Sequence, residues 1–173
     1  MSTISAEQIK GRSITGNKIT VPSGHVLHAP GHVVQAVQLS HPGNVGTISS
    51  NVLSTTSTSY VDFLVKAITT KLANSQIFIK TYSMYYGNAM YGDGRLLRDS
   101  TEIDACKYQI YTGESSDFHS FGFQILDSPN AAAGTTITYK QQVKYNSGAS
   151  LNMGYGDSGG KVNTNMILME IAQ

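Results

Sequence analysis

Side chains suited to molecular recognition are concentrated between residues 82 and 95. The tyrosines, amide and charged groups of this stretch that could contact a ligand are Tyr85, Tyr86, Asn88, Tyr91, Asp93 and Arg95. Tyrosine combines a flat stacking face with a hydroxyl group, and it loses little conformational entropy when it is ordered. Glycines at positions 87, 92 and 94 allow backbone conformations that are closed to other residues. The stretch therefore predicts a shaped, exposed loop that binds a glycan.

A second interpretation of the same stretch places two of its tyrosines in the core, at the end of a strand, with the rest in a tight turn. Tyr82 is the most core-like of them, because it closes the run of strand-forming residues 76–82. The two interpretations differ in a measurable way. Replacing Tyr86, Tyr91 and Arg95 together by alanine weakens binding if the loop is exposed, and lowers the melting temperature if these side chains are buried.

Residues 156–160 read GDSGG, the sequence that surrounds the nucleophilic serine of chymotrypsin-like proteases. In such a site the serine needs a histidine base that is oriented by an aspartate. Here thirteen residues follow Gly160, Lys161 stands where those proteases have proline, and no histidine lies in an Ala-Ala-His-Cys setting. We interpret the motif as a glycine-rich turn, with Asp157 in its usual turn role, and expect no enzyme activity. A hydrolase that uses Ser158 is the alternative.

Metal-ligand patterns are weak in this sequence. His25, His28 and His32 are spaced by three and four residues, and we expect them to pack against a neighbour. The acidic residues with calcium-binding potential are Asp93, Asp99, Glu102 and Asp104, but the twelve-residue calcium loop pattern is absent. Cys106 is the single cysteine, which excludes an internal disulfide and predicts a buried small residue. We expect neither a metal nor a cofactor.

Composition bounds the class of protein. The chain has 173 residues, of which 40% are hydrophobic and only 13% are charged, about half the usual share. A surface this poor in charge is typical of subunits that pack against copies of themselves. The net charge is +1 without a basic run, so we expect no nucleic-acid partner. There is no signal-type segment and no run of eighteen apolar residues, so we expect synthesis in a cytoplasm and no membrane insertion.

Short strand signals recur along the chain, and turn residues separate them. The expected strands cover residues 18–21, 32–39, 47–55, 60–65, 76–82, 107–111, 120–126, 135–144 and 150–155, with a last strand within 159–173. We expect residues 67–73 to be irregular. The last strand contains four consecutive apolar residues, 166–169, which predicts a central strand buried on both faces. The pattern predicts an all-β protein, an antiparallel β-sandwich of jelly-roll type.

The N-terminal region differs from the rest of the chain in its residue pattern. A capping-box pattern at residues 5–8 predicts a helical turn, and the rest up to residue 31 mixes scattered aliphatic residues with Gly and Pro. We therefore divide the chain into an extended arm, residues 1–31, and a β-sandwich head, residues 32–173. Because the arm has few strand signals of its own, we expect a partner to order it, and we expect a head without the arm still to fold.

Several short segments resemble small tail-fibre-like proteins of bacteriophages, especially those of marine and cyanobacterial phages. The lead-in at residues 16–26, GNKITVPSGHV, is similar to the N-terminal segment of those proteins. The later segments are Leu-Asp-Ser-Pro at 126–129, Tyr-Lys-x-Gln-x at 139–143 and Met-Glu-Ile-Ala at 169–172. Residues 82–104 match nothing in that group, and there we expect receptor-facing loops to diverge.

The resemblance implies a homotrimeric virion protein that is made in the host cytoplasm. It implies docking to other virion proteins through residues 1–31, and contact of the head with a host surface glycan or protein. The residues that we predict to bind this receptor are those of the tyrosine-rich stretch described above. A capsid decoration protein or head fibre built on the same fold is the alternative within this class.

Overall fold

The computed structural model describes residues 29–41, 53–87, 89–113, 117–148, 150–154 and 164–173. Within these ranges every regular element is a β-strand, and no helix is long and apolar enough to cross a membrane. The strands are β1 (Val33–His41), β2 (Leu53–Thr55), β3 (Val61–Thr69), β4 (Gln76–Gly87), β5 (Met90–Arg98), β6 (Thr101–Thr112), β7 (Asp117–Phe121), β8 (Gln124–Asp127), β9 (Thr136–Ser147), β10 (Leu151–Met153) and β11 (Thr164–Ile171). Residues 1–28 of the arm and the GDSGG segment lie outside the described residues.

The first sheet is organised around β4. One side of β4 pairs with β11 and, further along, with β10; the other side pairs with β8 and then β7. On the far side of these, β1 pairs with β11 and β2 pairs with β10. The seven strands therefore fill four positions across the sheet, because three of the positions are each made by two short strands in succession.

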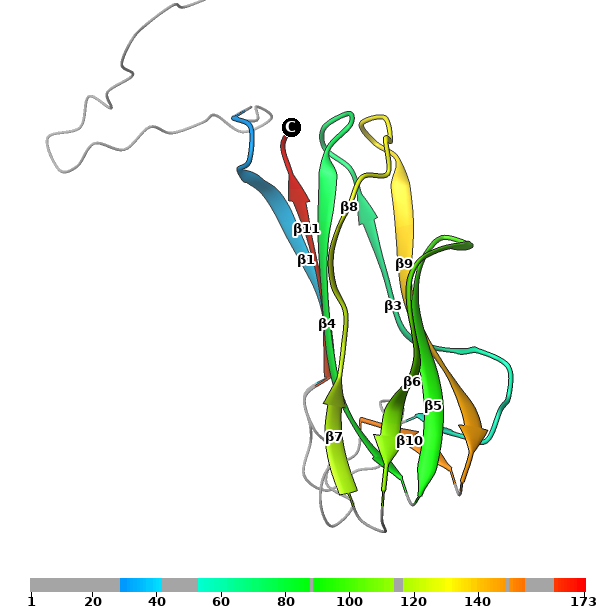
Figure 1. Ribbon diagram of the computed structural model, residues 1–173. Coiled ribbons are helices and arrows are strands. Elements are labelled where there is room, and N and C mark those ends of the chain that lie inside the picture. Colours follow the sequence, from blue (N-terminus) through cyan, green and yellow to red (C-terminus); the bar gives the residue numbers. More distant parts are fainter. Residues whose placement is uncertain (1–28, 42–52, 88, 114–116, 149, 155–163) are drawn as a thin grey trace, which may run out of the picture.

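The second sheet has the order β3-β9-β5-β6 and packs face to face on the first (Figure 1). If the strand positions of both sheets are numbered one to eight along the chain, the first sheet reads 1-8-3-6 and the second reads 2-7-4-5. Consecutive strand positions thus alternate between the layers except at one hairpin step, from β5 to β6. This is the double Greek-key order of a jelly roll, and it confirms the predicted antiparallel sandwich.

The core lies between the two sheets. Alternate residues of each strand face inward, as the period of two in a strand requires. The large side chains with no appreciable exposure are Tyr139, Leu64, Ile68, Ile77, Ile79, Met90, Leu96, Ile110, Leu151, Met153, Met166 and Leu168. Burial of such side chains contributes about 1.5–3 kcal/mol each before conformational entropy is subtracted.

The C-terminal strand β11 is central, as predicted, because it pairs with β1 on one side and β4 on the other. The prediction that both of its faces are buried is wrong. Met166 and Leu168 face the core and are fully buried, whereas Ile167 and Met169 point to the opposite, outer face and are half-buried. The apolar run of β11 therefore serves two surfaces, one inside the sandwich and one outside it.

Glu170 ties this strand to the loop between β3 and β4. Its carboxylate is fully buried and accepts hydrogen bonds from the backbone N–H groups of Lys71 and Leu72, both at 2.9 Å. The hydroxyl of Ser75 at 2.8 Å and the amide of Gln35 at 2.6 Å complete the set. Burial alone raises the pKa of Glu170, but these hydrogen bonds outweigh it and hold the pKa below the ordinary value.

Two parts of the strand prediction are wrong. Residues 67–69, expected to be irregular, complete β3. The stretch that includes residues 82–104 was expected to form divergent loops, but it contains the end of β4, all of β5 and the start of β6. β5 pairs with both β6 and β9, so it is an interior strand of the second sheet.

Candidate functional site

The six residues predicted to bind a receptor do not form one exposed loop. Tyr85 faces the core and is only 3% exposed, and its hydroxyl contacts the backbone of Tyr111 at 3.3 Å. Burial raises the pKa of the Tyr85 phenol. The predicted exposed position of Tyr85 is therefore wrong, and the alternative of a core tyrosine at the end of a strand holds for this residue. Tyr82, which was the stronger core candidate, is 39% exposed instead.

Tyr86 points away from Tyr85, to the outer face of the first sheet. There its ring stacks on Phe118 of β7 with the ring centroids 5.1 Å apart. Asn88 lies outside the described residues. Tyr85 and Tyr86, both on β4, are thus not placed with Tyr91, Asp93 and Arg95, which lie on β5 in the second sheet.

Tyr91, Asp93 and Arg95 alternate along β5, and all three point to the outer face of the second sheet. Tyr91 is 41% exposed and packs against Tyr111, its cross-strand partner on β6, at a centroid distance of 4.8 Å. Tyr111 is 44% exposed. Two adjacent exposed aromatic rings of this kind offer a stacking surface with two hydroxyl groups at its margin.

Next to this tyrosine pair, charged groups are joined in a network. Asp93 is only 4% exposed; it contacts Lys144 Nζ at 3.1 Å and accepts a hydrogen bond from the amide of Asn146 at 2.7 Å. Arg95 donates through Nε to Gln142 at 2.7 Å and lies 3.2 Å from Glu102. Each cation of the network is therefore held beside a carboxylate.

Tyr60, just before β3, packs over this network. The guanidinium of Arg95 lies 4.0 Å from the centre of its ring and the ammonium of Lys144 lies 5.3 Å from it, both within cation–π range. Burial, followed by the charge of Asp93, raises the pKa of Tyr60. We call the surface formed by Tyr60, Tyr91, Asp93, Arg95, Tyr111 and Lys144 the tyrosine face.

The tyrosine face contains the groups for non-covalent recognition of a polar, ring-containing ligand: flat aromatic surfaces and fixed donors and acceptors. Sequence reasoning identified Tyr91, Asp93 and Arg95 but missed Tyr60, Tyr111 and Lys144. The missing signal was the register between β5 and its neighbours, which brings Tyr111 and Lys144 opposite Tyr91 and Asp93.

The candidate metal ligands are not gathered together. Within the part of the chain that the structure describes, no three His, Cys, Asp or Glu side chains are placed to hold a metal ion. His32 is bonded through Nδ1 to the backbone of Ala29, while His25 and His28 lie outside the described residues. Cys106 is buried, as predicted, and burial raises the pKa of its thiol.

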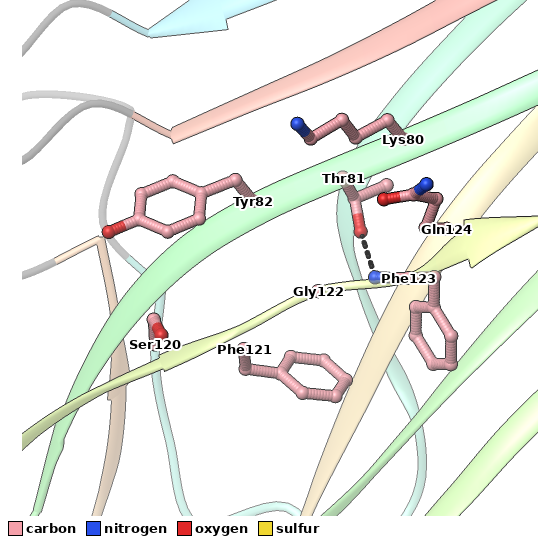
Figure 2. A pocket seen from close by; sticks show the side chains of 8 residues that line it. All are labelled: Lys80, Thr81, Tyr82, Ser120, Phe121, Gly122, Phe123 and Gln124. Carbon is pink, nitrogen blue, oxygen red and sulfur yellow. Dashed lines mark hydrogen bonds between the residues drawn. The ribbon is translucent and has the colours of Figure 1, made fainter.

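An open depression of about 220 Å³ lies where β7 gives way to β8 beside β4 (Figure 2). It is lined by Lys80, Thr81, Tyr82, Ser120, Phe121, Gly122, Phe123 and Gln124. A Cβ atom at Gly122 would lie 2.1 Å from the carbonyl oxygen of Thr81, so glycine is required for the backbones to approach this closely. The Phe123 N–H donates to the Thr81 hydroxyl at 2.8 Å and fixes this approach.

Comparisons with known proteins inform the fold. No protein-family model and no curated protein matches the chain. Among solved structures, the crystal structure of the infectious bursal disease virus VP2 subviral particle aligns with 90% of this chain and 37% of its own, with a TM-score of 0.50 at 9% identity. A structure of the Gx strain of this virus aligns with 90% and 41%, with a TM-score of 0.44 at 10% identity. The chain thus spans less than half of these proteins.

Proposed function

We propose that this protein is a structural subunit of a virus particle. The observation that carries the proposal is the 1-8-3-6 and 2-7-4-5 strand order, a jelly roll of the type used by viral capsid proteins among others. The likeness to the VP2 subviral particle supports it at the level of fold. The low charge content fits a subunit whose surface is largely covered by other subunits.

Within this class we propose a tail-fibre or receptor-binding protein without enzyme activity. Residues 1–31 dock to other virion proteins, and the head assembles as a homotrimer that carries the receptor site. The tyrosine face is the favoured receptor surface, because its exposed Tyr91 and Tyr111 rings lie beside fixed charges on a continuous sheet. The ligand that fits such a surface is a host glycan, stacked on the rings and hydrogen-bonded at its hydroxyl groups.

Labelling of purified particles tests the proposed function. A gold-tagged antibody against the head should label particles recovered from infected cells, and the label should lie on the tail. Label on the shell would instead favour the decoration protein or head fibre. Particles that lack the chain by both labelling and mass spectrometry would contradict the proposal as a whole.

Adsorption of particles to host cells tests the receptor surface. Changing Tyr91 and Tyr111 together to alanine should slow adsorption at least tenfold, since aromatic anchors often contribute about 1–2 kcal/mol each and several copies act together. Val65→Ala is the control, because Val65 is an exposed residue of β3 at the far edge of the same sheet. Equal adsorption of the double variant and the control would remove the tyrosine face from receptor binding.

A further inference from the structure

We propose that the outer face of the first sheet is the surface through which this chain binds a second copy of itself. The inference rests on the proposed role as an assembling virion subunit and names the face that assembles. We call this surface the apolar face. It is formed by the outward residues of β1, β11, β4 and the β8–β7 edge, which share one side of the sheet by register.

An uninterrupted apolar row crosses this face from edge to edge. Ala36 on β1 lies opposite Met169 on β11, Met169 lies opposite Phe78 on β4, and Phe78 lies opposite Leu126 on β8. None of the four belongs to the core or packs against it. Leu126, on the edge strand β8, is 50% exposed, which is unusual for a large aliphatic side chain. Within the described part of the chain, these four side chains contribute to no core, and they lie on the outer side of the sheet.

Along β11 the apolar side chains continue on both sides of this row, whereas the next row across the sheet is mostly polar and consists of Gln38, Ile167, Lys80 and Gln124. Ile167 and Ile171 flank Met169 along β11, and the stacked rings of Tyr86 and Phe118 lie at the other end of β4. Among the described outward side chains of the face, Lys80 is the single charged one. Depletion of charge with retention of aromatic rings and methionine is the composition of the buried part of protein interfaces.

The size of the face matches that of a subunit contact. Four strands about 4.8 Å apart and the twelve residues of β4 at about 3.3 Å each give a sheet face of roughly 750 Å². A specific interface takes about 800 Å² from each partner.

A second copy is the occupant that this chemistry favours. A nucleic acid would require cations and a charged protein partner would require complementary charges, but the face offers only Lys80. A second copy of this chain, in which only 13% of the residues are charged, offers what is missing, a surface poor in charge. In the proposed homotrimer, the apolar face of each copy would pack against the neighbouring copy around the three-fold axis.

Sedimentation of the full-length protein at micromolar concentrations tests the proposal. The wild-type protein should sediment as an oligomer, and Leu126→Glu should raise the dissociation constant at least tenfold, because an unpaired carboxylate would be buried in the contact. Ala36→Glu, at the opposite end of the apolar row, should have the same effect. Both residues are exposed within one chain, so the variants should fold; far-UV circular dichroism checks this.

Val65→Glu provides the matched control. Val65 is also an exposed aliphatic residue on an edge strand, but it lies on the outer face of the second sheet opposite Lys140. It should leave the dissociation constant unchanged. The inference is overturned by a monomeric wild-type protein, by unchanged association of both apolar-face variants, or by equal dissociation with Val65→Glu. Absence of the chain from particles would instead overturn the proposed function, so the two failures are distinguishable.

Discussion

The two outer faces of the sandwich differ in the number of charged side chains that they carry. On the second sheet, Asp93, Lys144, Arg95 and Glu102 are neutralised by one another across neighbouring strands. On the first sheet, Lys80 is the single charged side chain among the described outward residues, and the other side chains are aliphatic, thioether, aromatic, amide or hydroxyl groups. Of the two outer faces, as far as their residues are described, one thus carries nearly all the charges, and the other is suited to association.

The two sheets also differ in continuity. The second sheet uses four unbroken strands, whereas the first is stepped at Gly122, between β7 and β8, where a depression opens on its outer side. The charged network therefore stands on a continuous surface, and the apolar face contains the break. Free energies of unfolding are compared at equal protein concentration, since association contributes to apparent stability.

The largest effect is expected where the first sheet is stepped. Gly122→Ala should lower the free energy of unfolding by about 3 kcal/mol, because the added methyl group would meet the Thr81 backbone, which cannot rotate away. Gly113→Ala is the control, since its nearest neighbour would be the hydroxyl of Tyr111, at the end of a movable side chain. Urea denaturation compares the two variants. A Gly122→Ala protein as stable as Gly113→Ala would mean that the strands are not held this close.

A smaller effect is expected from the ionic contact that joins the two sheets. Asp127 on β8 contacts Arg98 on β5 at 2.8 Å and accepts a hydrogen bond from Tyr139 on β9 at 2.7 Å. Asp127→Asn should cost about 2–3 kcal/mol, because Arg98 and the buried Tyr139 lose a charged partner.

Asp62→Asn is the matched change on the outer face of the second sheet. Asp62 contacts Lys140 at 3.4 Å in an exposed setting, so its loss should cost less than about 1 kcal/mol. Chemical denaturation of the two variants gives the comparison. Equal losses in the free energy of unfolding would contradict this expectation, because the exposed contact of Asp62 would then stabilise the fold as much as the contact of Asp127 between the sheets.

Part of this arrangement could be predicted from the sequence. The aliphatic runs at residues 32–39 and 76–82 and the last strand are visible because their apolar residues gather in short runs between turn signals. β5 was missed because Gly92 and Gly94 look like loop residues. The structure gives Gly94 another reason: a Cβ atom there would lie 2.2 Å from the ring of Phe121. Glycine is needed at position 94 because of a contact between the two sheets, and the local sequence around Gly94 does not show this contact.

Only part of the candidate site was predicted, because the sequence does not show which distant strands pair. Tyr91, Asp93 and Arg95 have the spacing of one strand face, which becomes informative only once β5 is recognised as a strand. Tyr111 and Lys144 belong to the site through strand register, Tyr60 joins it by packing over the cations, and Tyr85 is excluded from it by facing the core. Residue types thus indicated the chemistry, while the pairing of distant strands decided which residues share it.

The smallest expected effect is a pH dependence at the end of the sandwich, away from either outer face. The pKa of Glu170 is lowered from its ordinary value of 4.5, since its hydrogen bonds outweigh the cost of burial. Its stabilisation is therefore fully present above pH 4.5 and is lost as the pH falls through the lower folded pKa. Thermal melts of Glu170→Gln should show a shallower decline on acidification than the wild-type protein. Parallel pH profiles would contradict this role.

Methionine oxidation tests the division between the two faces most directly, because the chain carries its own internal standards. Met84 and Met169 are half-buried on the apolar face, whereas Met90, Met153 and Met166 are fully buried in the core. Under hydrogen peroxide, peptide mass spectrometry of the assembled wild-type protein should show Met84 and Met169 oxidising as slowly as the core methionines. In Leu126→Glu they should oxidise several-fold faster while the core methionines stay unchanged. Equal rates for Met84 and Met169 in both proteins would contradict the account, since the apolar face would then be as open in the assembled protein as in the separated subunit.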